Sequence, residues 1–163
     1  MERLKKDELI EAYREVYDAV PQEALELDLR ITGKTIQALA KGKPVSPYEL
    51  ARVWGMPLEQ VESVLAGAVA AERAEVDSQG DLVGGVLSLN PTAHRISMVG
   101  THSNTWCAYD AIYTPGVVGM TARLVSQDPL TGESIRMTIT PRGVEDLRPQ
   151  GTVVSAVGGE TDT

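Results

Sequence analysis

The chain has 163 residues, a formal net charge of −8 at pH 7 and a single cysteine. This length fits one domain or two very small ones, and it can bury a hydrophobic core without disulfides. The excess of carboxylates argues against a nucleic-acid or membrane-surface binder, because both need clustered Lys and Arg. One cysteine excludes an internal disulfide framework and any multi-thiolate site built from this chain alone.

The sequence also predicts where the protein resides. The segment 1–16 is charged throughout and contains no apolar stretch of signal-peptide length. No apolar run reaches the length needed to cross a bilayer. A lone cysteine suits a reducing compartment. We therefore expect a soluble, cytoplasmic protein without a membrane partner.

The first half of the sequence has helical patterning. Apolar residues recur at helix spacing until Pro21, which ends the first run. Further helices are predicted over 34–41, 46–54 and 58–70. In front of the 46–54 helix, Ser46 is a candidate N-cap, Pro47 occupies the first helical position and Glu49 is placed to complete a capping box.

After Glu75 the pattern changes to short β-type runs that are bounded by Gly, Pro, Asn or Asp. Residues 76–83 are predicted to form a hairpin around a glycine turn, and residues 105–113 a short helix. Other strands are predicted over 86–89, 94–99, 117–125, 134–140 and 152–157.

The predicted fold class is therefore α+β. A helical, winged-helix-like unit is expected over 1–75, and a β-rich unit with a mixed or antiparallel sheet and one short helix over 76–163. Helices followed by a hairpin have the order of a winged helix-turn-helix, which is a DNA-binding arrangement. The exposed face of its last helix, however, would present Glu59 and Glu62 to the phosphates, where cations and amides are needed. We therefore predict a packing scaffold and no nucleic-acid partner.

The stretch 103–111 (Ser-Asn-Thr-Trp-Cys-Ala-Tyr-Asp-Ala) carries the clearest chemical signal. If one of the residues 103–105 caps a helix that starts near Trp106, Cys107 lies in the first turn, where unpaired N–H groups and the helix dipole favour a thiolate. Asp110 follows three residues later and shares that face. A soft thiolate beside a proton-carrying carboxyl can bind a soft metal centre and protonate the group attached to it.

Two other interpretations of Cys107 remain open. It can be a small buried hydrophobe, as lone cysteines often are, with Asp110 as a surface or capping residue. It can also be the nucleophile of a Cys/His hydrolase with His94 or His102 as the base. Neither histidine has a diagnostic spacing from the cysteine.

The residues around Cys107 resemble those of a known family. The segment 106–110, then Pro115, then Gly-Met-Thr-Ala-Arg at 119–123 are similar to the organomercurial (alkylmercury) lyases. Similar segments in the same order extend this resemblance over roughly residues 34–157. The resemblance implies protonolysis of a carbon–mercury bond, in which the Cys107 thiolate captures the mercury and Asp110 carries a proton to the carbon. No cofactor is implied, since mercury is part of the substrate.

This chain has no counterpart for one part of the family's catalytic site. Trp106 and Tyr109 flank the thiol and are candidate walls of the substrate pocket. The family's second catalytic cysteine lies in a C-terminal segment without a counterpart here, and Asp128, near where some members carry an additional cysteine, is a hard ligand that suits mercury poorly. We therefore expect an external thiol, a second chain of a homodimer or a partner subunit to complete the site. Otherwise the scaffold serves a different cysteine-dependent reaction or a non-catalytic role.

Overall fold

The computed structural model describes residues 22–98 and 100–154. In this part of the chain the helices are α2 (Gln22–Leu39), α3 (Pro47–Trp54), α4 (Leu58–Ala70) and α5 (Ala108–Val118). The strands are β1 (Glu75–Val76), β2 (Leu82–Gly84), β3 (Leu87–Ser88), β4 (His94–Met98), β5 (Thr101–Thr105), β6 (Ala122–Gln127), β7 (Ser134–Thr140) and β8 (Gly143–Arg148). They form an antiparallel sheet in the order β1-β2-β3-β5-β4-β6-β7-β8. The α+β class predicted from the sequence is confirmed.

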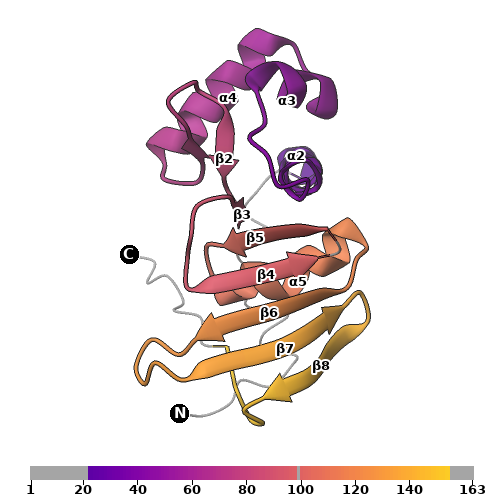
Figure 1. The fold of residues 1–163 in the computed structure, drawn as a ribbon. Coiled ribbons are helices and arrows are strands. Elements are labelled where there is room, and N and C mark those ends of the chain that lie inside the picture. The colour runs from indigo at the N-terminus through magenta and orange to yellow at the C-terminus, as the bar shows by residue number, and fades with distance from the viewer. Residues whose placement is uncertain (1–21, 99, 155–163) are drawn as a thin grey trace, which may run out of the picture.

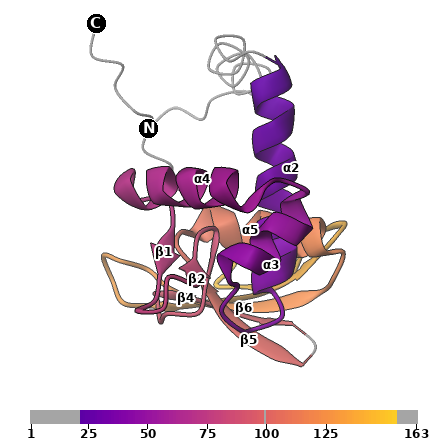
Figure 2. The same ribbon diagram turned by 90° about the horizontal axis from the view of Figure 1, so that it is seen from above.

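The helices form two groups around this sheet. Helices α2, α3 and α4 gather beyond the end that holds the short strands β1–β3, whereas α5 lies behind the longer strands β4–β6 (Figure 1). Seen from above, α2 and α4 cross at a steep angle (Figure 2). No helix among the described residues is both long and apolar enough to cross a membrane.

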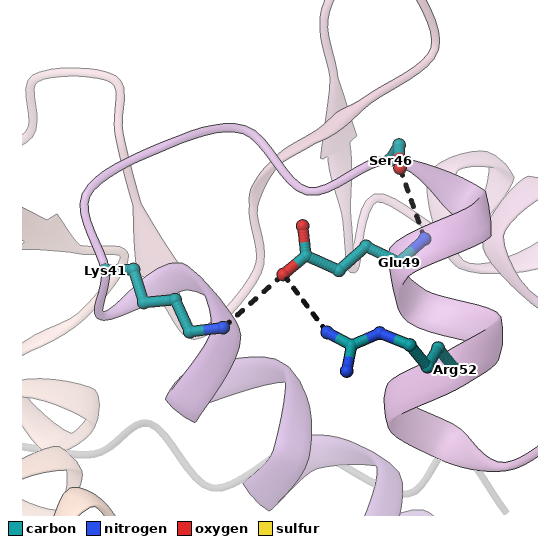
Figure 3. A network of polar contacts seen from close by, with 4 residues as sticks. All are labelled: Lys41, Ser46, Glu49 and Arg52. Carbon is teal, nitrogen blue, oxygen red and sulfur yellow. Dashed lines mark hydrogen bonds and ion pairs between the residues drawn. The ribbon is translucent and has the colours of Figure 1, made fainter.

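The start of α3 follows from its sequence. Ser46 is the N-cap, its Oγ accepts a hydrogen bond from the Glu49 N–H at 3.2 Å, and Pro47 occupies the first helical position. The Glu49 carboxylate lies 3.4 Å from Lys41 Nζ and 4.0 Å from Arg52, so that it links the turn after α2 to α3 (Figure 3). The N-cap is confirmed, but the predicted capping box was wrong, because the Glu49 carboxylate pairs with Lys41 and Arg52 instead of the Ser46 N–H.

Removing the N-cap is expected to lower the free energy of unfolding more than removing the ion pairs does. Ser46→Ala leaves the Glu49 N–H without its acceptor and should lower the free energy of unfolding by about 1 kcal/mol. Glu49→Gln removes only ion pairs to well-exposed cations, so its effect should stay within about 0.5 kcal/mol. Urea denaturation followed by circular dichroism measures both, and a larger loss in Glu49→Gln would contradict this ranking.

The main hydrophobic core joins the helices to the sheet. It contains fully buried side chains from α2 and α3, such as Ile36 and Leu50, together with Ile96 and Met98 of β4. Trp54 at the end of α3 packs into the same cluster, and its indole N–H donates to Thr35 Oγ1 at 3.0 Å. The division of the chain into two units at residue 75 stays a prediction. The core contains residues from both sides of this boundary.

Several predicted elements have different bounds in the structure. The helix predicted over 34–41 is the end of the longer α2, and the helix predicted before Pro21 lies outside the described residues. The strand predicted over 117–125 was wrong at its start, because α5 continues through Val118 and ends at Gly119 in a left-handed conformation (φ 69°). Val117 and Val118 are β-branched, yet they pack on the main core as helical residues.

Two strands were not predicted because they are polar. Strand β5 (Thr-His-Ser-Asn-Thr) contains no aliphatic residue, and β8 is exposed along most of its length. No strand forms over residues 152–154, contrary to the prediction for 152–157, and residues 155–157 lie outside the described part. The edge position next to β7 is taken by β8 instead, which follows β7 through a tight turn at Pro141 and Arg142.

Candidate active site

A buried threonine anchors the chain where β5 leads into α5. Thr105 ends β5 and is fully buried, and its Oγ1 donates to the Cys107 carbonyl at 3.0 Å. The Thr105 carbonyl accepts from Thr92 Oγ1 at 2.7 Å. Cys107 is therefore held from the strand side before the helix begins.

Cys107 and Asp110 bind each other's backbone at the start of α5. The Asp110 N–H donates to Cys107 Sγ at 3.3 Å, and the Cys107 N–H donates to Asp110 Oδ2 at 3.0 Å. Cys107 is thus the N-cap itself, in extended backbone (φ −134°, ψ 168°), and the expectation that a residue from 103–105 caps the helix was wrong. The two side chains complete a capping box, a reciprocal arrangement that satisfies two N–H groups and fixes both functional groups together.

The surroundings keep the sulfur protonated rather than ionised. Cys107 is exposed as a residue, but partial burial raises the pKa of its thiol, and the Asp110 carboxylate raises it further. The backbone N–H groups of Asp110 and Tyr109 act in the opposite direction without overcoming this. The expected lowering of the thiol pKa by the helix start was therefore wrong, since burial and the nearby negative charge outweigh the helix dipole.

Asp110→Asn should make the thiol more reactive. The amide oxygen can still accept from the Cys107 N–H, while the negative charge that raises the thiol pKa is removed. We expect the pH midpoint of Cys107 alkylation by iodoacetamide to move down, so that alkylation below the midpoint is faster than in the wild-type protein. Mass spectrometry over a pH series measures it. An unchanged or higher midpoint would contradict the role assigned to the carboxylate.

His94 lies near enough to Asp110 to interact with its charge, which the separation of the two residues in the sequence did not indicate. The β4–β5 hairpin turns at Gly100 and places His94 opposite Thr105. The His94 Nδ1 lies 2.6 Å from Ser126 Oγ; burial lowers the pKa of His94, and the Asp110 carboxylate partly offsets this. His102, the other candidate base, lies farther along the hairpin, is exposed and bonds Ser97 Oγ at 3.0 Å.

A cavity of about 550 Å³ adjoins the capping box. Trp106 and Asp110 line it, together with residues of α2 and α4 and the segment 82–86. Cys107 and Tyr109 are not among its lining residues; the Tyr109 ring packs against Tyr113 instead, with ring centroids 5.7 Å apart. The helical unit supplies most of the walls, which nothing in its sequence pattern indicated.

The remaining sequence candidate lies in a loop. Asp128 follows β6, and its carboxylate accepts from the N–H groups of Leu130 at 2.9 Å and Thr131 at 2.8 Å. These hydrogen bonds lower the pKa of Asp128. The carboxylate therefore stabilises the turn in which it lies. Within the described part of the chain, no group of three or more His, Cys, Asp or Glu could hold a metal ion.

Comparisons with known proteins bear on this arrangement. The family model described as alkylmercury lyase (MerB) matches residues 87–163. An alkylmercury lyase from Staphylococcus epidermidis is 37% identical over 122 residues, which is 75% of this chain and 55% of that protein. One from Streptomyces lividans is 34% identical over the same shares, and one from Pseudomonas putida is 35% identical over 74% and 55%. The chain thus spans about half the length of these relatives.

The fold agrees with these sequence matches. The mercury-bound crystal structure of a protein called MerB2 has a TM-score of 0.65 with this chain, at 22% identity, and the match covers 89% of this chain and 69% of that one. At this identity the likeness concerns the fold. The sequence matches include the helix that carries the capping box; residues 87–163 match the alkylmercury lyase family, and 75% of the chain is similar to its members.

Proposed function

We propose that this chain cleaves carbon–mercury bonds, with Cys107 as the group that captures mercury and Asp110 as the group that protonates carbon. The observation that carries the proposal is the reciprocal capping box, which holds a thiol and a carboxylate in contact at one helix start. Sulfur is the ligand class that a soft metal such as mercury prefers. The named activity of the relatives supports the same reaction.

The first step exchanges the thiol proton for mercury. The thiol is protonated at neutral pH because its pKa is raised. When Cys107 Sγ bonds to the mercury of an organomercurial salt, the counter-ion leaves and the thiol proton passes to the Asp110 carboxylate. Mercury capture therefore attaches the substrate to Cys107 and also protonates Asp110.

The second step returns this proton to carbon. Asp110, now a carboxylic acid, donates its proton to the mercury-bound carbon, the carbon–mercury bond breaks, and its electron pair forms the new carbon–hydrogen bond. A hydrocarbon leaves, Asp110 is again a carboxylate, and mercury remains on Cys107 as a cation. A second thiolate then binds this mercury, and a further external thiol displaces it from Cys107, which regains a proton as mercury leaves bonded to two thiolates.

The second thiolate has to come from outside these 163 residues, because the sequence holds one cysteine. An external small thiol is the simplest source, and a reducing compartment supplies one, in keeping with the expected cytoplasmic location. A homodimer or a partner subunit could deliver the same group, and both remain proposals.

Hydrocarbon release tests this function. Phenylmercury and excess cysteine are incubated with the protein, and benzene is measured by gas chromatography. Cys107→Ser should abolish benzene release, and Asp110→Asn should lower it by about 100-fold or more, because the proton donor is gone. Asp128→Asn is the matched control, since that carboxylate serves only its own turn.

The same experiment can contradict the proposal. Stoichiometric mercury binding without benzene release would indicate sequestration rather than cleavage. Full activity of Asp110→Asn would remove the carboxyl group from the reaction. If Asp110 is the acid, the Asp110→Asn protein should combine two properties. Its thiol should be alkylated faster than that of the wild-type protein, and its benzene release should be slower.

A further inference from the structure

The cavity beside the capping box is mostly apolar and extends from Asp110 into the helical unit. Its aliphatic and aromatic walls include Ile31, Ile36, Leu39, Trp54, Leu65 and Trp106. Arg73 and Asp110 are the charged residues that line it. The acid of the proposed reaction therefore lies in the wall of an apolar space that the helical unit lines on most of its sides.

The chemistry of the reaction determines which part of the substrate occupies this space. Mercury must bond to Cys107 Sγ, and the carbon it carries must lie within reach of the Asp110 carboxyl. Because Asp110 lines the cavity and Cys107 does not, the organic group lies on the cavity side of the mercury. We propose that this cavity binds the hydrocarbon group of the substrate and selects organomercurials with a bulky apolar group, aryl or long alkyl, over methylmercury. This inference rests on the proposed function.

The size of the cavity supports a bulky group. Its volume of about 550 Å³ lies within the range of roughly 300–1,000 Å³ that is typical of pockets for drug-sized ligands. A methyl group would leave most of it unfilled. An aromatic ring would exchange water contact for contact with apolar walls, which is favourable.

Two small residues of α4 leave room along one wall of the cavity. Gly67 and Ala68 both line the cavity. A Cβ placed on Gly67 meets no atom within 4 Å, so a side chain can begin there without displacing its neighbours. Leucine also favours a helix interior more than glycine does, so Gly67→Leu should not unfold the protein.

The cavity also carries its own reporter. The chain has two tryptophans, Trp54 and Trp106, and both line this cavity. Tryptophan fluorescence therefore reports its occupancy without any signal from elsewhere in the chain. Binding of a mercury-free hydrocarbon can be measured in this way, independently of catalysis.

The first test compares substrates. We expect the ratio of kcat/KM for 1-naphthylmercury to that for methylmercury to fall at least tenfold in Gly67→Leu and in Ala68→Leu. Ala66→Leu, at an exposed neighbouring position of α4 that does not line the cavity, should leave the ratio unchanged. Unchanged ratios in both cavity variants would overturn the inference.

The second test separates this inference from the proposed function. Naphthalene is titrated into Cys107→Ser protein, and a saturable change in tryptophan fluorescence is expected, with at least tenfold weaker binding when Gly67→Leu or Ala68→Leu is added. Absence of saturable binding overturns the cavity assignment even if both organomercurials are cleaved. If naphthalene binds but the wild-type protein cleaves neither organomercurial, the hydrocarbon site stands and the proposed reaction fails.

Discussion

The site depends on two hydrogen bonds that run in opposite directions between Cys107 and Asp110. Each side chain accepts from the backbone of the other, so neither group can leave without freeing an N–H of the first helical turn. Serine, threonine, aspartate and asparagine are the usual residues at this position. A cysteine fills the same structural role here with a sulfur atom that can also bind a soft metal, so the helix start and the proposed reaction use the same atom.

The negative charge of Asp110 at this helix start favours proton transfer from the Cys107 thiol to the carboxylate. The carboxylate raises the pKa of the thiol that it touches, and it is thereby placed to receive the proton that the thiol loses. His94 lies near enough to interact with the same carboxylate, but its burial favours the neutral imidazole. The His94 ring bonds Ser126 Oγ, whereas the hydrogen-bond partner of Cys107 is Asp110, which favours the Cys/Asp pair over the Cys/His hydrolase that the sequence left open.

The sequence predicted the local features and missed those that depend on long-range packing. The cap at Ser46, the break at Gly55 and strand β7 follow from short-range rules and are confirmed. Strands β5 and β8 are polar, so only their pairing partners define them. The spacing of Cys107 and Asp110 indicated their shared helix turn, whereas the thiol pKa depends on burial, and the cavity depends on how α2 and α4 pack over Trp106. Neither can be read from neighbouring residues.

The main hydrophobic core, which joins the helices to the sheet, restricts how this protein can evolve. Ile36 and Leu50 of the helical unit pack in the same cluster as Ile96 and Met98 of the sheet. Exchanging the helical unit between relatives would therefore change the interior of both parts at once. A hybrid gene would need compensating substitutions on the strand side before it folded, so these two stretches of sequence are expected to be inherited together rather than shuffled as independent modules.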